Sequence, residues 1–69
     1  MSIKDRRKAI GWTRKDLAHR TGVNSAAIAM IERGGWTEED ALTRVAFILA
    51  KAEEGELDVV LPPPEQPKD

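Results

Sequence analysis

The sequence contains no cysteine, one histidine and three aromatic side chains, and these shortages exclude several classes of protein. Without cysteine, disulfide bonds and thiolate metal sites are excluded. The single histidine, His19, stands beside Arg20, and the sequence offers it no matched set of catalytic or metal-binding partners. Glycine-rich phosphate loops and nucleophile motifs are also missing. We therefore expect no enzyme, no metal site and no cofactor.

Long apolar runs are missing as well. No stretch approaches the roughly 18 apolar residues that a membrane-spanning helix needs, and no signal-peptide pattern is present. The 69 residues, of which 41% are hydrophobic, are enough for one small domain but not for a deep catalytic cleft. We expect a soluble, cytoplasmic protein that makes no contact with a membrane.

The formal net charge of −1 conceals an uneven distribution of charge along the chain. Residues 1–36 carry a net +5 and residues 37–69 a net −6. A basic half is typical of a protein that binds a polyanion on one face. A solvated mixed surface would give the same composition, so charge alone leaves the two interpretations open.

Residues 13–33 predict two short helices separated by a glycine. Thr13 can cap the first helix, with Asp16 in the position that completes a capping box. Gly22 stands where the chain must turn sharply, and we expect it to adopt a positive φ. Asn24 can then cap the second helix. Leu17 and Ala18 face inward from the first helix, and Ile28 and Ile31 do so from the second.

This stretch resembles the helix-turn-helix of the XRE-type, phage-repressor and Cro-like DNA-binding proteins. It contains the pattern T-x-x-D-L-A-x-x-T-G-V-N-x-x-x-I-x-x-I-E-R-G, and the resemblance covers roughly residues 3–50. The residues at framework positions of that family are Leu17, Ala18, Gly22, Val23, Ile28, Ile31, Glu32, Arg33 and Gly34. Two residues depart from the pattern: Thr21 replaces an aliphatic residue, and Arg14 stands where glutamine is common.

The resemblance implies an all-α fold, a compact four- to five-helix bundle of the lambda-repressor kind. We expect the helix-turn-helix domain to span residues 1–55. Residues 56–69 form a C-terminal extension, which we expect to offer a dimer contact and then to end in a disordered tail over residues 65–69. A first helix is predicted between the cap Ser2, with Asp5 in the capping-box position, and Gly11. Its inward residues are expected to be Ile3, Ala9 and Ile10, and the Trp12 that follows should lie in or near the core.

A fourth helix is predicted from Thr37 to about Glu54–Gly55. Its apolar stripe at helical spacing is expected to be core and consists of Ala41, Leu42, Val45, Ile48, Leu49 and Ala52. Phe47 points almost opposite to Val45, which suggests a surface for a partner. Residues 57–61 favour an extended conformation, and they can pack across the fourth helix or pair with a second copy of the chain. The expected dimer interface consists of Phe47, Ala50, Leu57, Val59, Val60 and Leu61.

In the resembling family an arginine of the first helix pairs with a glutamate near the end of the recognition helix, and Arg7 and Glu32 occupy those positions. The second helix of a helix-turn-helix enters the major groove of DNA. The residues expected to contact DNA are Thr13, Arg14, Lys15, Asn24, Ser25, Ala26, Ala29, Met30 and Arg33. Thr13 and Asn24 stand at helix N-termini, where backbone N–H groups can hold phosphates.

The recognition face offers few hydrogen bonds, because Ala26, Ala29 and Met30 are apolar. We expect specificity to depend on Arg14, Ser25 and Arg33, together with thymine methyl contacts and DNA shape. The predicted function is a transcriptional repressor that binds an inverted-repeat operator as a homodimer and regulates its own phage or mobile-element operon, such as an anti-CRISPR operon. The alternative is an antitoxin or another module that binds a protein partner.

Overall fold

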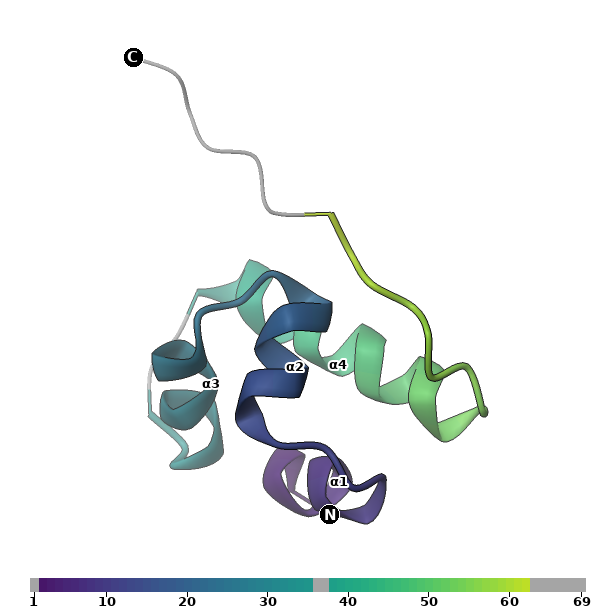
Figure 1. The fold of residues 1–69 in the computed structure, drawn as a ribbon. Coiled ribbons are helices and arrows are strands. Elements are labelled where there is room, and N and C mark those ends of the chain that lie inside the picture. The colour runs from purple at the N-terminus through teal and green to yellow at the C-terminus, as the bar shows by residue number, and fades with distance from the viewer. Residues whose placement is uncertain (1, 36–37, 63–69) are drawn as a thin grey trace.

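The computed structural model describes residues 2–35 and 38–62, and these residues form four helices. The helices are α1 (Ile3–Ala9), α2 (Arg14–Thr21), α3 (Ser25–Glu32) and α4 (Glu39–Glu53). In Figure 1, α2 lies at the centre, with α1, α3 and α4 arranged around it. The predicted all-α class with a helix-turn-helix is confirmed. A fifth helix is not formed within the described residues.

Helix α1 begins as predicted but faces the core with different residues. Ser2 Oγ accepts a hydrogen bond from the Asp5 backbone N–H at 3.1 Å, and Gly11 follows the helix with φ +78°. Ile3 and Ile10 pack against the core, but Ala9 is exposed, so its predicted inward position is wrong. Arg7 faces inward instead, because it lies four residues after Ile3 and on the same face of the helix.

Helix α4 buries most of its predicted apolar stripe. Val45 and Leu49 are fully buried, whereas Leu42 remains 44% exposed, so its assignment to the core is wrong. Each residue of a helix is rotated by about 100° from the one before it. Val45 and Leu49 therefore lie near the centre of the buried stripe, and Leu42 lies at its edge. Phe47 points outward, as predicted, and is 45% exposed. The helix starts at Glu39 with Glu38 as an N-cap that makes no side-chain hydrogen bond, and Thr37, the predicted cap, lies outside the described residues.

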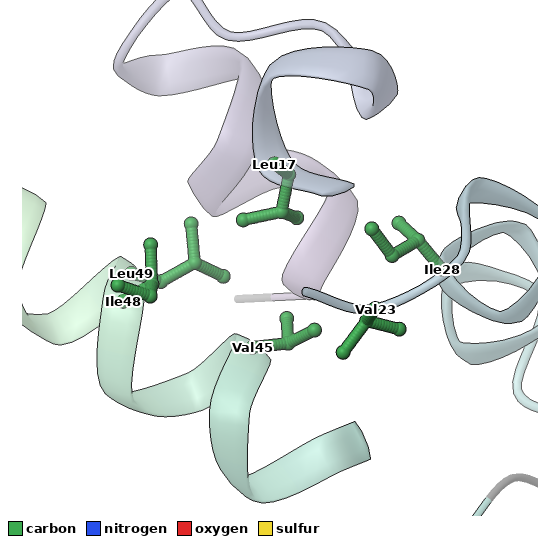
Figure 2. Packing of buried hydrophobic residues seen from close by; sticks show 6 residues of the cluster. All are labelled: Leu17, Val23, Ile28, Val45, Ile48 and Leu49. Carbon is green, nitrogen blue, oxygen red and sulfur yellow. The ribbon is translucent and has the colours of Figure 1, made fainter. Parts of the chain in front are cut away.

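The core is a single cluster of aliphatic side chains between α2, α3 and α4. Figure 2 shows Leu17, Val23, Ile28, Val45, Ile48 and Leu49 pointing toward one another. Trp12, Ala18 and Ile31 pack against this cluster and are partly buried, in agreement with their predicted places. The cluster fixes the angle between α2 and α3, because it takes Leu17 from one and Ile28 from the other.

Thr21 belongs to this interior although its side chain is polar. It is fully buried, and its hydroxyl donates to the Leu17 carbonyl oxygen at 2.8 Å. Thr21 Oγ1 in turn accepts a hydrogen bond from the Val23 backbone N–H at 3.1 Å. The threonine that departs from the family pattern therefore satisfies its own hydrogen-bonding capacity and an N–H group of the turn.

The segment after α4 folds back onto its own chain. In Figure 1 it leaves the end of α4 and returns toward the end of α2. The Leu61 backbone N–H donates to the Arg20 carbonyl oxygen at 2.8 Å, and Val59 and Leu61 pack against the core cluster. Residues 57–61 thus pack on their own chain, and their pairing with a second copy stays a prediction. The predicted disorder of residues 65–69 lies outside the described residues. Within those residues, no helix is long and apolar enough to cross a membrane.

Candidate nucleic-acid interface

The start of α2 is held by a complete capping box. The Asp16 backbone N–H donates to Thr13 Oγ1 at 3.1 Å, and the Thr13 backbone N–H donates to Asp16 Oδ2 at 2.9 Å. These hydrogen bonds lower the pKa of the Asp16 carboxyl. The reciprocal cap fixes the direction in which α2 leaves Trp12. It thereby places Arg14 and Lys15, both exposed, in the first turn of α2.

The turn between α2 and α3 has the predicted geometry. Gly22 adopts φ +73°, and its N–H donates to the Ala18 carbonyl oxygen at 3.0 Å. Asn24 Oδ1 accepts from the Ala26 backbone N–H at 2.7 Å and caps α3. Val23, between them, is buried in the core. A left-handed glycine, a buried valine and an asparagine cap together set how α3 departs from α2.

The outer face of α3 carries the residues expected to read DNA. Ser25, Ala26, Met30 and Arg33 are exposed, and Ala29 is half-buried. Met30 is 40% exposed, and its sulfur lies 3.4 Å from an Nη atom of Arg33. Ile28, on the opposite side, is fully buried. The helix thus presents a small, mostly apolar surface with a hydroxyl at its start and a guanidinium at its end.

Glu32, at the end of α3, binds two arginines. Its side chain is 1% exposed, and its Oε2 accepts from Arg7 Nε at 2.7 Å. Its Oε1 accepts from Arg14 Nε at 2.9 Å. Arg7 also donates from Nη1 to the Trp12 carbonyl oxygen at 2.8 Å. The ion pair between Arg7 and Glu32 therefore forms as the family pattern implies, and Arg14 joins it.

The electrostatics of this cluster favour an ionised Glu32. Burial raises the pKa of the carboxyl. The hydrogen bonds from Arg7 and Arg14 lower this pKa by a larger amount, so the pKa of Glu32 is lowered overall. Two guanidinium groups share one carboxylate, so the cluster keeps a net charge of about +1. Arg7 is 8% exposed at its side chain and Arg14 is 47% exposed. The charge that reaches the surface therefore belongs to Arg14.

The remaining basic residues differ in the contacts and ion pairs that they form within the protein. Several make contacts within the protein: Arg6 donates to Glu53 at 2.7 and 2.8 Å, Arg20 lies 4.4 Å above the Trp12 ring, and Arg44 donates to the Thr21 carbonyl oxygen at 3.0 Å. Among the described residues, the basic side chains that form no ion pair are Lys4, Lys8, Lys15, Arg20 and Arg33. Lys15 and Arg33 are exposed and belong to the predicted DNA-contacting set.

The expected dimer residues are not all accessible. Phe47, Ala50, Leu57 and Val60 are exposed, whereas Val59 and Leu61 pack against the core of their own chain. Lys51 lies 5.5 Å from the centroid of the Phe47 ring. An apolar surface for a second copy would therefore have to use the four exposed residues.

Sequence reasoning missed three contacts at and behind this surface. It did not foresee that Arg14 pairs with Glu32, nor that Arg20 and Arg44 hold the C-terminal segment. Arg20 Nε donates to the Leu57 carbonyl oxygen at 3.3 Å, and Arg44 Nη1 donates to that of Pro62 at 2.6 Å. The unusual arginine at position 14 was the only available signal, and it did not reveal the partner. Within residues 2–35 and 38–62, no group of three acidic or histidine side chains could hold a metal ion.

Comparison with known proteins agrees with this geometry. A family model described as helix-turn-helix matches residues 3–52, which includes all four helices except the last residue of α4. No curated protein and no solved structure gives a significant match.

Proposed function

The chain belongs to the XRE-type helix-turn-helix family of DNA-binding transcription regulators, and we propose that it is a sequence-specific repressor that binds an inverted-repeat operator as a homodimer. The observation that carries this proposal is the outer face of α3. Ser25, Met30 and Arg33 are exposed there, while Ile28 anchors the opposite face in the core. A helix held in this way can enter a major groove without disturbing the fold.

The surroundings of α3 support DNA over an uncharged partner. Arg14 and Lys15 lie in the first turn of α2, and Arg33 follows the last residue of α3. In helix-turn-helix proteins the first helix of the motif crosses the DNA backbone while the second lies in the groove. Basic residues at these places can bind phosphates on both sides of the groove. The direct readout is sparse, so Ser25, Arg33, thymine methyl contacts and DNA shape would supply the specificity.

Two copies of the domain are expected on the operator. One small domain makes few contacts, and a two-fold-related site lets a pair of recognition helices lie about 34 Å apart in successive major grooves. Phe47, Ala50, Leu57 and Val60 are the exposed residues that we propose for the contact between copies. Occupation of a promoter by such a dimer represses transcription by steric exclusion. A promoter of the protein's own phage or mobile-element operon, such as an anti-CRISPR operon, is the operator that we propose.

The test is binding of the full chain to the DNA upstream of its own gene, followed by fluorescence anisotropy. We expect tighter binding to an inverted repeat than to a scrambled duplex, and affinity that falls steeply as salt rises. Arg33→Ala should weaken operator binding about tenfold. Lys4→Ala, which removes an exposed charge of α1 outside the proposed surface, is the matched control and should have little effect. Equal binding to both duplexes at every salt concentration would contradict sequence-specific recognition.

The dimer contact has its own test. Phe47→Asp should give monomers by light scattering, because a carboxylate would have to be desolvated in an apolar contact. Ala9→Asp places the same charge at an exposed position of α1 and should leave the oligomeric state unchanged. A Phe47→Asp protein that remains dimeric would contradict the placement of the interface.

A second function is favoured by one observation, the apolar character of the α3 face. Ala26, Ala29 and Met30 could pack against a protein, as expected of an antitoxin or another interaction module. Such a module would purify with a stoichiometric partner, and loss of the Arg33 charge would have little effect on that complex. A purified chain that ignores its upstream DNA at low salt but retains such a partner would favour this function.

A further inference from the structure

Arg7 and Arg14 share the Glu32 carboxylate, but their geometry gives them different roles. Arg7 uses Nε and Nη2 for Glu32 and Nη1 for the Trp12 carbonyl oxygen, and its side chain is 8% exposed. All three of its nitrogens therefore have partners inside the protein. Arg7 ties α1 to the end of α3, and its burial leaves little of its guanidinium accessible to a ligand.

Arg14 uses only one of its nitrogens. Its Nε donates to Glu32 Oε1 at 2.9 Å, and in the described part of the chain its two terminal nitrogens make no hydrogen bond. The side chain is 47% exposed and belongs to the first residue of α2. Both terminal nitrogens thus remain available at the surface, while the inner edge of the guanidinium is tied to a buried carboxylate.

We propose that Arg14 binds a phosphate of the DNA backbone and that Glu32, which touches no DNA, is the residue that positions its guanidinium. This inference rests on the proposed function. A phosphate is favoured over a base because α2 is the helix of the motif that crosses the backbone. The terminal nitrogens of a guanidinium match the oxygens of a phosphate in a two-pronged contact.

The pairing with Glu32 improves this contact by restricting Arg14 before DNA arrives. A free arginine loses rotamer freedom when it is immobilised at an interface, and that loss weakens binding. The hydrogen bond to Glu32 restricts the side chain in the unbound protein. Arg7 also pairs with Glu32, so the one negative charge of the carboxylate is shared by two guanidinium groups. Glu32 therefore does not neutralise Arg14 completely.

Two substitutions at position 14 separate charge from position. Arg14→Ala removes both, so we expect binding to weaken about tenfold and the slope of log K against log salt to become shallower by about one. Arg14→Lys keeps the charge, but its single nitrogen cannot bind Glu32 and also present two free nitrogens. We expect the lysine variant to keep the slope of the wild type and to bind about threefold to tenfold more weakly.

The kind of DNA contact is decided by comparing two duplexes. A phosphate contact carries no sequence information, so both variants should lose affinity for the operator and for a scrambled duplex by the same factor. Loss of affinity for the operator alone would overturn the assignment to a phosphate. Wild-type affinity in Arg14→Ala would overturn the contact itself.

The role of Glu32 is tested by repeating the lysine exchange with glutamine at position 32. Glutamine lacks the negative charge and replaces one carboxylate oxygen with an NH₂ group, so it cannot keep all the hydrogen bonds that Arg7 and Arg14 make with Glu32, and the restraint on Arg14 should weaken. In that background Arg14→Lys should change affinity by less than about twofold, whereas with Glu32 it changes affinity several-fold. An equal penalty in the two backgrounds would overturn the positioning role.

A matched control uses the pair between Arg6 and Glu53, which has similar hydrogen-bond lengths of 2.7 and 2.8 Å. Arg6→Lys, alone or with Glu53→Gln, should leave DNA affinity unchanged, because this pair joins α1 to α4 away from the proposed surface.

If Glu32→Gln prevents folding, the lysine and alanine variants at position 14 decide the outcome. Lysine binding as tightly as arginine would then overturn the inference. Failure of the wild type to bind DNA would instead refute the proposed function.

Discussion

The backbone N–H of Leu61 donates a hydrogen bond of 2.8 Å to the carbonyl oxygen of Arg20. Arg20 lies at the end of α2, and Leu61 lies outside the residues that the family model matches. The bond therefore attaches a segment beyond the family domain to the helix that precedes the recognition helix. The Leu61 side chain also packs against the core cluster.

We predict that this attachment stabilises the domain. Leu61→Ala should lower the free energy of unfolding by about 1–2 kcal/mol, less than for a fully buried leucine, because the side chain is only partly buried. Asp58→Ala removes a nearby exposed side chain that is not part of the proposed dimer contact and should change stability very little. Urea unfolding followed by circular dichroism measures both. Equal effects of the two variants would contradict the packing of Leu61 on the core.

Thr21 supplies a second prediction. Thr21→Val replaces the residue with the aliphatic kind that the family prefers, yet it leaves the buried Val23 N–H without its acceptor at 3.1 Å. We expect unfolding to become easier by about 1–3 kcal/mol despite the gain in hydrophobicity. Thr21→Ser keeps the hydroxyl and separates its loss from the loss of a methyl group. A valine variant at least as stable as the wild type would contradict this account.

The pH dependence of stability follows from the lowered pKa of Glu32. A carboxyl whose pKa is lower in the folded state stabilises the fold above its unfolded pKa. That contribution is lost as the pH falls through the folded value. The wild type should therefore lose stability in acid more steeply than Glu32→Gln, with the difference between them shrinking below about pH 4. Thermal unfolding measured from pH 7 to pH 3 tests this, because Asp16 and Glu53, whose pKa values are also lowered, are present in both proteins. A constant difference across that range would contradict the role of Glu32.

The two leucines that the sequence assigned alike should behave differently. Leu17 is fully buried, and Leu17→Ala should destabilise the domain by about 2–5 kcal/mol, enough to unfold a small protein in large part. Leu42 is 44% exposed, and Leu42→Ala should be tolerated. Circular dichroism at 25 °C distinguishes a folded from an unfolded chain. A folded Leu17→Ala variant with an unchanged melting temperature would place the core elsewhere.

Local sequence was sufficient to predict the four helices and the N-caps of α1, α2 and α3. The capping box of α2, the glycine at position 22 and the asparagine at position 24 act through contacts within four residues, so their geometry can be deduced from spacing alone. The spacing of Leu17, Ile28, Val45 and Leu49 was likewise enough to predict most of the core. The predictions for Ala9 and Leu42 were wrong. Both residues lie at the boundary of a buried face, where the periodic pattern does not decide whether a side chain is buried or exposed.

Only the tertiary structure decided which distant groups meet. Arg14 lies 18 residues from Glu32, and Arg44 lies 18 residues from the Pro62 carbonyl oxygen that it binds. Such pairs depend on the angles between helices, which the packing of the whole core sets, and periodicity contains no information about them. The sequence by itself determined a helix-turn-helix with a basic surface. The fold alone determined that Arg14 shares the Glu32 carboxylate with Arg7, and that the C-terminal segment closes over its own core.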